Sequence, residues 1–348
     1  MNTSISTSPL TYPFPEPPAA GTVREVAPGV FWLRMPLPFA LDHINLWLLR
    51  DGDGWTAVDT GIGLDDTRAY WEQIFREVVG GAGLKRVLVT HFHPDHMGNA
   101  GWLTQRFGAP LWMTESEYLT AHAQYQAQAG FGSDATAVLF AEHGLDEARV
   151  AGVRGRGNSY RKIVSEPPTR FARMMDGDEI SIGGRRWRVI VGWGHAPEHA
   201  ALHCEELGVL ISGDMLLPKI STNVSVWPME PGGDPLKLFL RSIDSFARLP
   251  ADTLVLPSHG LPFRGAHARV QMLHDHHRDR LAEVLEACAV PTSATDLLPV
   301  LFRRTLDLHQ TFFAMGEAVA HLHYLWYQGR LTRSRDDLGV YRFSVNRP

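Results

Sequence analysis

The stretch that decides the fold is Arg86–His96, which reads RVLVTHFHPDH. Its first half, Arg86–Thr90, is a short β-branched and apolar run typical of a buried strand. In the extended loop that follows, His91 and His93 alternate and can face one side, while the next carboxylate and histidine can turn toward a second point. Imidazole and carboxylate groups are ligands suited to Zn²⁺, Fe²⁺ or Mn²⁺. The stretch therefore predicts a strand whose end offers ligands to two adjacent metal ions.

Four other short runs are also rich in apolar and β-branched residues, so five buried strands are expected: Trp55–Val58, Arg86–Thr90, Trp187–Val191, Gly208–Ser212 and Thr253–Leu256. The side chains that follow these runs are all Asp or His: Asp59, His91, His195, Asp214 and His259. Helical patterns at Thr67–Val79 and Pro235–Phe246 alternate with the strands, as in an α/β layer fold. Residues at strand ends are held rigidly at an open rim, which is where such folds place their sites.

One histidine at a strand end is usually a hydrogen-bonded structural residue. Five strand ends that all carry Asp or His are instead typical of a metal site. Several polar side chains crowded at one rim would lack charge compensation without a metal. A carboxylate that reaches both ions, for which Asp214 is the candidate, would hold them about 3.5–4 Å apart. His199 is a candidate for substrate contact or for support of the site. Other histidines are expected to be structural because they lie on or beside a predicted helix: His267, His274, His276 and His277.

Short motifs around these positions resemble those of the metallo-β-lactamase-fold hydrolase superfamily. The HxHxDH signature begins at His91, and it is accompanied in the usual order by four motifs: VDTG (Val58–Gly61), GHAPEH (Gly194–His199), SGD (Ser212–Asp214) and PSHG (Pro257–Gly260). The resemblance covers roughly residues 21–265. It implies an αββα four-layer sandwich of the α+β class that carries a dinuclear metal site.

The resemblance also implies which residues bind each metal. One ion would be held by His91, His93 and His195, the other by Asp95, His96 and His259, with Asp214 bridging them. Asp59 would order the ligand loop without binding metal. The expected cofactors are two divalent metal ions, with Zn²⁺ as the first choice and Fe or Mn as alternatives.

Such a site predicts a metal-dependent hydrolase. A hydroxide that bridges the two ions would attack a small ester, a lactone or a thioester of the acyl-coenzyme A or glutathione type. Asp95 could relay a proton, and His199 could supply one to the leaving group. Two alternatives stay open at this point: a phosphodiesterase or ribonuclease, and an iron-dependent oxygenase that uses the same ligands.

The chain is expected to have three parts. Residues 1–20 form an extended Pro-rich arm, residues 21–265 the catalytic domain, and residues 266–348 a small, mainly helical domain that resembles a winged helix. A helical insertion at about 114–173 is expected to act as a lid, with hinges at Gly130, Gly132 and Gly144. Its residues expected to contact substrate are aromatic or basic: Tyr118, Tyr160, Arg154, Arg156 and Arg161. The arginines would attract an anionic group.

Composition excludes several classes of protein. Hydrophobic residues make up 44% and charged residues 20% of 348, which rules out a disordered chain, and no apolar run is long enough to span a bilayer. A net charge of −5 argues against nucleic acid as a partner and favours a small molecule. Two cysteines and the lack of a signal-like N-terminus predict a cytoplasmic protein without disulfides. The C-terminal part is expected to serve as a structural cap or to form a homodimer.

Overall fold

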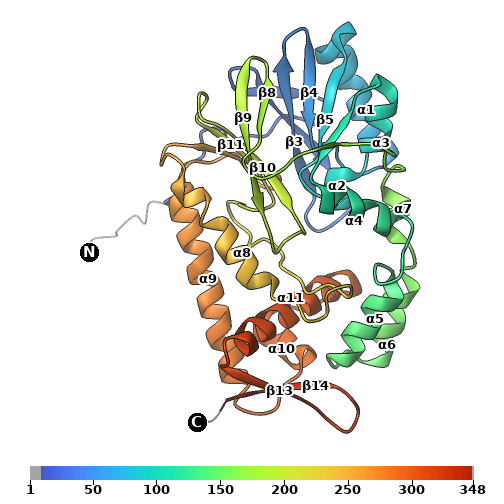
Figure 1. Cartoon of the computed structure of the whole chain (residues 1–348), viewed down its shortest axis with the longest axis vertical. Coiled ribbons are helices and arrows are strands. Elements are labelled where there is room, and N and C mark those ends of the chain that lie inside the picture. The colour runs from blue at the N-terminus through green and yellow to red at the C-terminus, as the bar shows by residue number, and fades with distance from the viewer. Residues whose placement is uncertain (1–8, 347–348) are drawn as a thin grey trace.

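The computed structural model describes residues 9–346, and two β-sheets dominate its upper half (Figure 1). The first sheet has seven strands in chain order: β1 (Val23–Ala27), β2 (Val30–Pro36), β3 (His43–Asp51), β4 (Gly54–Val58), β5 (Leu84–Leu88), β6 (Leu111–Met113) and β7 (Ala172–Arg173). The first four strands pair antiparallel, and β4 to β7 pair parallel.

The second sheet has five strands: β8 (Glu179–Ile182), β9 (Arg185–Gly192), β10 (His199–Cys204), β11 (Val209–Gly213) and β12 (Leu254–Pro257). Their order is β12-β11-β10-β9-β8, and only β11 and β12 run parallel. The parallel strands of both sheets end at the residues expected to form the site, because β4 leads to Asp59, β5 to His91, β11 to Asp214 and β12 to His259.

Alternating side chains of each strand enter different cores, which makes the sheets the inner layers of a sandwich. Trp47 and Leu49 of β3 pack between the sheets, whereas Leu48 packs on the opposite face toward the outer helices. In β9, Val189 and Val191 face the space between the sheets, and Ile190 packs toward the helices on the other side. The expected αββα sandwich is therefore confirmed.

The outer layers are helical. Beside the first sheet lie α1 (Asp65–Ile74), α2 (Pro94–Met97) and α3 (Ala100–Phe107), and beside the second sheet lie α8 (Pro235–Ile243) and the long α9 (Ala266–Ala287) (Figure 1). The pattern expected at Thr67–Val79 is an α-helix that continues as a π-helical turn over Phe75–Val79. All five predicted strands are present, with ends shifted by one or two residues.

The insertion between β6 and β7 contains four helices: α4 (Glu115–Tyr125), α5 (Ser133–Glu142), α6 (Glu147–Gly155) and α7 (Ser159–Ile163). Helices α4 and α7 pack with the first sheet, because Tyr118, Tyr125 and Tyr160 join its outer core. In contrast, α5 and α6 share a core with the C-terminal part of the chain, as Phe140 and Val153 show. The insertion thus connects two parts of the molecule.

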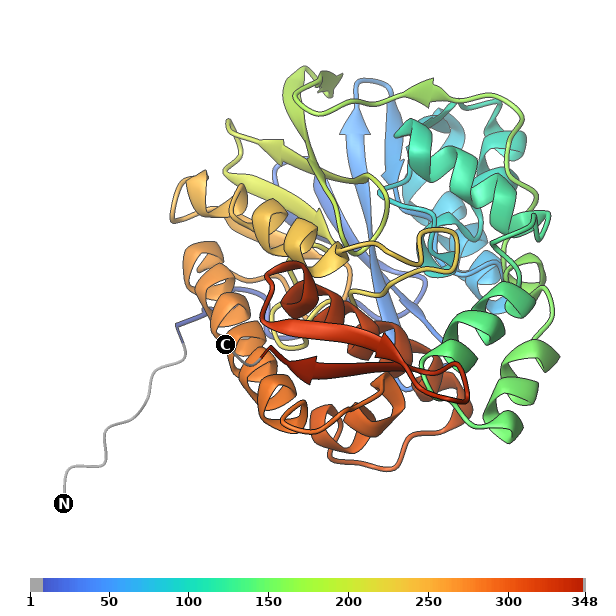
Figure 2. The same cartoon turned by 60° about the horizontal axis from the view of Figure 1, so that its bottom comes forward.

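The C-terminal part is mainly helical, as expected. After α9 come α10 (Ala294–Leu301), α11 (Leu308–Tyr327) and a two-stranded sheet, β13 (Leu331–Arg335) with β14 (Tyr341–Val345) (Figure 2). Both figures place α5 and α6 beside this part, and α6 contacts α11. The hinge expected at Gly144 is tightly packed, since a Cβ there would lie 2.7 Å from the Ser293 hydroxyl of the C-terminal part.

The described portion of the Pro-rich arm, residues 9–20, lies along the body of the protein. Thr11 and Arg264 exchange backbone hydrogen bonds, and Leu10 is buried in the core beside α9. Residues 1–8 lie outside the described residues. Among residues 9–346, no helix is both long enough and apolar enough to cross a membrane.

Candidate metal centre

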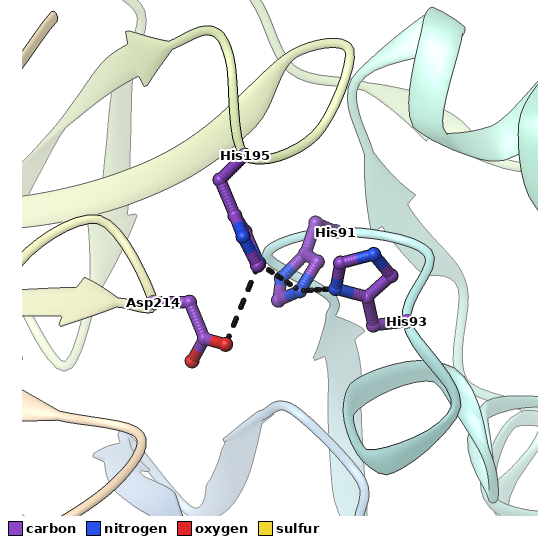
Figure 3. A group of neighbouring side chains, drawn as sticks. All are labelled: His91, His93, His195 and Asp214. Atoms are coloured by element: carbon purple, nitrogen blue, oxygen red, sulfur yellow. Dashed lines mark hydrogen bonds and ion pairs between the residues drawn. The ribbon is translucent and has the colours of Figure 1, made fainter. Parts of the chain in front are cut away.

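Four side chains from three different segments converge at the carboxyl ends of β5 and β11 (Figure 3). His91, His93, His195 and Asp214 each offer a ligand atom, and these atoms lie within 4.8 Å of one another. His91 Nε2 is 2.8 Å from His93 Nδ1 and 3.2 Å from His195 Nε2. One ion would fit among these atoms.

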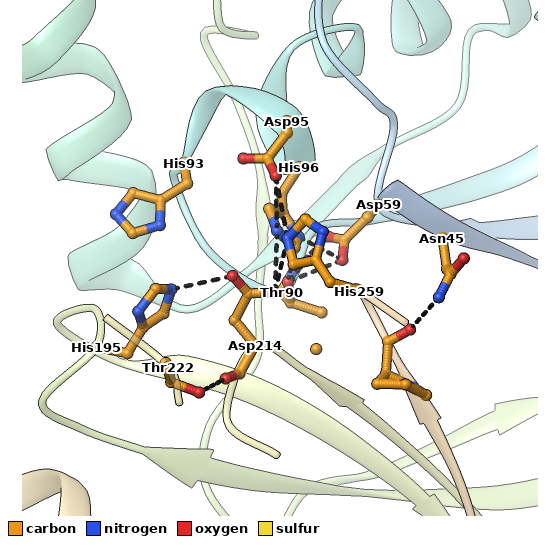
Figure 4. A network of polar contacts seen from close by, with 12 residues as sticks. Asn45, Asp59, Thr90, His93, Asp95, His96, His195, Asp214, Thr222 and His259 are labelled. Carbon is orange, nitrogen blue, oxygen red and sulfur yellow. Dashed lines mark hydrogen bonds and ion pairs between the residues drawn. The ribbon is translucent and has the colours of Figure 1, made fainter. Parts of the chain in front are cut away.

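A second group lies on the other side of Asp214 (Figure 4). Asp95, His96 and His259 bring their ligand atoms within the same 4.8 Å limit. Oδ1 of Asp214 is 3.4 Å from His96 Nε2 and 3.5 Å from His259 Nε2, whereas its Oδ2 is 3.4 Å from His195 Nε2 in the first group. Asp214 therefore faces both groups with different oxygens, as a bridging carboxylate would.

Asp59 and Thr90 are buried side by side and support the ligand loop through hydrogen bonds. The Asp59 backbone has φ of 60°, a conformation rare outside glycine, and its carboxylate accepts hydrogen bonds from the Thr90 amide at 2.8 Å and hydroxyl at 2.9 Å. The same carboxylate is 2.8 Å from His96 Nδ1, and the Thr90 hydroxyl is 3.0 Å from His91 Nδ1. Both imidazoles are thereby held with Nε2 toward the centre. That Asp59 orders the ligand loop stays a prediction, which these contacts support.

The histidines contributed by the second sheet are oriented in the same way. Nδ1 of His195 donates to the Asn223 carbonyl at 2.7 Å, and Nδ1 of His259 donates to the His43 carbonyl at 2.8 Å. Such outer hydrogen bonds fix the tautomer and leave Nε2 as a lone-pair donor. His93 differs, because its Nδ1 is the nitrogen that faces the cluster.

Two buried atoms in the cluster lack hydrogen-bond partners among the described residues, namely His96 Nε2 and Asp214 Oδ1. Unpaired buried polar atoms are costly, and the cluster also brings Nε2 of His91 and Nε2 of His195 to 3.2 Å from each other. Cations between these atoms would remove both costs. The donor set of imidazoles and carboxylates therefore fits two divalent ions.

The electrostatics of the two groups differ when no ion is bound. Burial lowers the pKa of His93 to about 3 and that of His91 well below the usual range, so these two imidazoles are neutral and ready to coordinate. Burial also disfavours charge on His259, but Asp214 and Asp95 outweigh it and raise the pKa of this imidazole to about 10. An ion entering the second group therefore displaces a proton.

His199 lies beneath the cluster and not at its mouth. Its ring is fully buried, and its Nε2 accepts a hydrogen bond of 3.1 Å from the Asp214 backbone amide. A Cβ on Gly213 would lie 2.2 Å from the same nitrogen, so glycine there lets the ring approach. Because the buried ring contacts the Asp214 backbone and is not exposed at the mouth of the site, we propose a positioning role for His199 in place of the catalytic role expected from the sequence.

Glu117 of α4 is a functional candidate that the sequence did not reveal. Its fully buried carboxylate accepts backbone hydrogen bonds from Phe92 at 2.9 Å and from Glu198 at 2.7 Å. It thus ties the His91–His96 loop to the loop that follows His195. Burial raises the pKa of Glu117 to about 8. No local motif marks it, because an acidic residue in the first turn of a helix is ordinary.

The expected substrate residues of the insertion occupy different environments. The hydroxyls of Tyr118 and Tyr160 are already used, since they donate to the carbonyls of Pro168 at 3.0 Å and Phe92 at 2.6 Å. Both rings are buried, so they support the site in place of the substrate contact expected from the sequence. The three arginines contact three different partners: Arg154 faces Asp134, Arg161 the Tyr125 ring, and Arg156 the Phe312 ring.

Comparison with known protein families agrees with this geometry. The sequence model of the Metallo-beta-lactamase superfamily matches residues 40–259, which include every residue of both ligand groups. The chain belongs to the metallo-beta-lactamase superfamily. A second model, for the Metallo-beta-lactamase-like C-terminal domain, matches residues 281–346 and covers α10, α11 and the two-stranded sheet. The enzyme is accordingly a metallo-hydrolase, as the sequence predicted.

Solved structures of this superfamily share the whole fold. A beta-lactamase domain protein from Burkholderia ambifaria is 50% identical, with a TM-score of 0.91 over 97% of this chain and 98% of its own. A metallo-beta-lactamase family protein from Thermus thermophilus is 33% identical, with a TM-score of 0.80 over 92% of this chain and 100% of its own.

Two curated relatives have names that refer to hydrolysis. The probable metallo-hydrolase YqjP of Bacillus subtilis is 25% identical and aligns over 91% of this chain and 98% of its own length. The acyl-coenzyme A thioesterase MBLAC2 of Gallus gallus is 27% identical over 56% of this chain and 65% of its own length.

Proposed function

We propose that this protein is a dinuclear, Zn²⁺-dependent thioesterase that hydrolyses an acyl thioester with an anionic leaving group, such as coenzyme A or glutathione. The observation that carries the proposal is Asp214, which faces a separate group of ligand atoms with each of its two carboxylate oxygens. The two ligand groups would hold one ion each, and ions bound there would supply Lewis-acid chemistry that activates a water and polarises the carbonyl of a bound acyl group.

The residues of the chain would divide the work as follows. Four of the ligand histidines, His91, His96, His195 and His259, keep Nε2 free for coordination, because backbone carbonyls, Asp59 and Thr90 accept their Nδ1–H groups. Asp95 has a side chain that is 19% exposed, more than the fully buried His96 beside it, so it lies where water and substrate can enter. Its carboxylate would take the proton from the attacking water and return it to the departing thiolate as the C–S bond breaks.

We propose a thioester, and not another acyl compound, as the substrate for two reasons. The printed name of the MBLAC2 relative is that of an acyl-coenzyme A thioesterase, although the alignment covers only part of both chains. The insertion also carries Arg154 and Arg156 at the end of α6 and Arg161 on α7. We propose that these charges attract an anionic leaving group.

A substrate panel tests the proposal. Protein loaded with Zn²⁺ would be assayed with an acyl-coenzyme A, an acyl-glutathione, a p-nitrophenyl ester, a homoserine lactone and bis-p-nitrophenyl phosphate. We expect the highest kcat/KM for a thioester and its loss after chelation. Turnover of the phosphodiester alone, or turnover that survives complete metal removal, would refute the proposal.

A further inference from the structure

Four aromatic rings and one arginine meet where three segments of the chain come together. We call this group the aromatic shelf; it comprises Phe39, Arg156, His309, Phe312 and Phe313. The Phe39 and His309 rings stack with centroids 5.2 Å apart at 14°, and His309 is 5.1 Å from Phe313. Phe312 and Phe313 are 5.5 Å apart, so the rings form a continuous row.

Two rings of the shelf are partly exposed to solvent. Phe39 is 38% and Phe313 is 39% exposed, which is high for phenylalanine. Exposed aromatic faces cost free energy in water and readily stack on planar ligands. Because these rings come from the β2–β3 loop and from α11, a ligand stacked here would touch both the catalytic part and the C-terminal part of the chain.

Arg156 gives the shelf a positive charge that has no acidic partner among the described residues. Its guanidinium carbon lies 4.5 Å from the centroid of Phe312, and its Nη1 is buried without a hydrogen-bond partner in the described range. In contrast, Arg149 and Arg154 on the preceding helix face Asp146 and Asp134. An unpaired guanidinium beside aromatic rings is suited to a phosphate or carboxylate oxygen.

The first link between the shelf and the metal centre is the β2–β3 loop. Phe39 lies four residues before His43, which limits their separation to about 14 Å of extended chain. His43 accepts the Nδ1 proton of His259 on its backbone carbonyl. One end of the shelf is therefore within a short reach of the second ligand group.

Two other links lead to the first ligand group. Arg156 lies four residues before Tyr160, whose hydroxyl donates to the carbonyl of Phe92 in the ligand loop. His309 lies two helical turns, about 12 Å, before Glu317 on α11. Glu317 accepts a 3.4 Å hydrogen bond from the side chain of the residue whose carbonyl orients His195. Because each of these links is short, we expect the leaving group of a long thioester to span the distance from the shelf to the centre.

We infer that the aromatic shelf binds the nucleotide headgroup of a coenzyme A-type substrate, with a ring of the shelf stacked on the base and Arg156 paired with a phosphate. This inference rests on the proposed thioesterase function and specifies the leaving group. Stacking on an aromatic side chain stabilises a bound base, and a guanidinium–phosphate pair adds charge-assisted hydrogen bonds. The shelf would hold the headgroup while the acyl carbonyl lies at the ions.

The direct test is the binding of adenosine 3′,5′-bisphosphate, a fragment that carries the headgroup but no thioester, measured by calorimetry. We expect Arg156→Ala to weaken its Kd at least about tenfold and Phe39→Ala to weaken it by a similar factor, since one removes the ion pair and the other the stacking face. Arg186→Ala is the matched control, because this exposed arginine lies at the start of β9, away from the shelf. Thermal melts would confirm folding, and Arg156→Gln, which removes the charge but keeps part of the side-chain stem, replaces Arg156→Ala if the latter unfolds. Wild-type protein that fails to bind the fragment, or shelf variants that bind it like the wild type, would overturn the inference.

Kinetics separate this inference from the proposed function. The same acyl group would be presented on coenzyme A and on N-acetylcysteamine, which lacks the nucleotide. We expect Arg156→Ala to raise KM about tenfold for the coenzyme A thioester and to leave the N-acetylcysteamine thioester unchanged. An equal change for both substrates would overturn the inference. If the wild type hydrolyses neither thioester, the proposed function fails, and the calorimetry still decides whether the shelf binds a nucleotide.

Discussion

Asp214 is the residue on which both ligand groups depend, because its two oxygens face different groups at 3.4–3.5 Å. We expect Asp214→Ala or His91→Ala to lower metal content and to reduce turnover. The reduction should exceed the 10–100-fold that is typical when a residue hydrogen-bonded to a metal ligand is replaced. The control is His277→Ala in α9, whose ring packs against Phe239 and His321 and should affect stability alone. Metal analysis and assay of the same samples would check this. Full activity of either ligand variant would contradict the dinuclear assignment.

Glu117 should make stability depend on pH. Burial raises its pKa to about 8, so the folded protein binds a proton that the unfolded chain releases at an ordinary carboxyl pKa. Stability must then fall as pH rises from about 4.5 to about 8. Glu117→Gln removes this slope but leaves one backbone N–H unpaired, at a cost of about 1–3 kcal/mol. In metal-free protein, the stability gap between wild type and variant should narrow across this range.

Urea unfolding at several pH values would measure that gap. Glu115→Gln, an exposed change on the same helix, is the matched control, and its free energy of unfolding should depend on pH as that of the wild type does. If the free energy of unfolding of Glu117→Gln shows the same pH dependence as the wild type, the buried carboxylate does not titrate in this pH range. Sequence reasoning could not have found Glu117, because its importance arises from two amides that are distant in the chain.

Among the elements, the strand ends were the most predictable from sequence. Short apolar runs followed by Asp or His locate both the parallel strands and the rim, because side chains at the ends of neighbouring strands lie together. The edge hairpin β1–β2 and the long β3 were not predicted. Residues Ile44–Leu49 of β3 are buried on both faces, so their apolar run lacks the two-residue alternation that indicates a strand.

Helix α11 supports the centre through a close contact at Gly316. A Cβ there would lie 2.6 Å from the Ser225 hydroxyl and 2.7 Å from its Cβ, in the segment that carries Asn223 and so orients His195. We expect Gly316→Ala to destabilise the protein by about 1–3 kcal/mol and to weaken metal binding. Gly155→Ala is the control, since nothing lies within 4 Å of its position, and it should be neutral or stabilising by up to about 1 kcal/mol. Melting temperature and metal affinity would be compared, and similar effects of both variants would contradict this role of α11.

At the scale of the whole molecule, the insertion and the C-terminal part share one core. This could not be predicted, because α5 and α6 find their partners more than 150 residues away and no local pattern indicates which surface they cover. Buried residues of both segments, such as Val153 and Met315, belong to the same cluster. The α5 and α6 half of the expected lid is therefore packed against the C-terminal part, because its apolar side chains are already buried there.

Hydrogen exchange would test this shared core. Met315→Ala deletes a fully buried side chain of α11 and should cost about 2–5 kcal/mol. Exchange should accelerate in α5 and α6 together with α11, while β2 and β3 keep their protection. Acceleration confined to α9–α11 would show that the insertion moves independently.

We propose that two ions, held on either side of Asp214, are required for hydrolysis. Metal-free protein would be titrated with Zn²⁺, and bound metal per chain and turnover of an acyl-coenzyme A thioester would be recorded in the same samples. We predict that binding saturates at two ions per chain and that turnover, absent from the metal-free protein, rises with occupancy to its maximum there. Saturation at one ion with full turnover, or turnover in the metal-free protein, would contradict it.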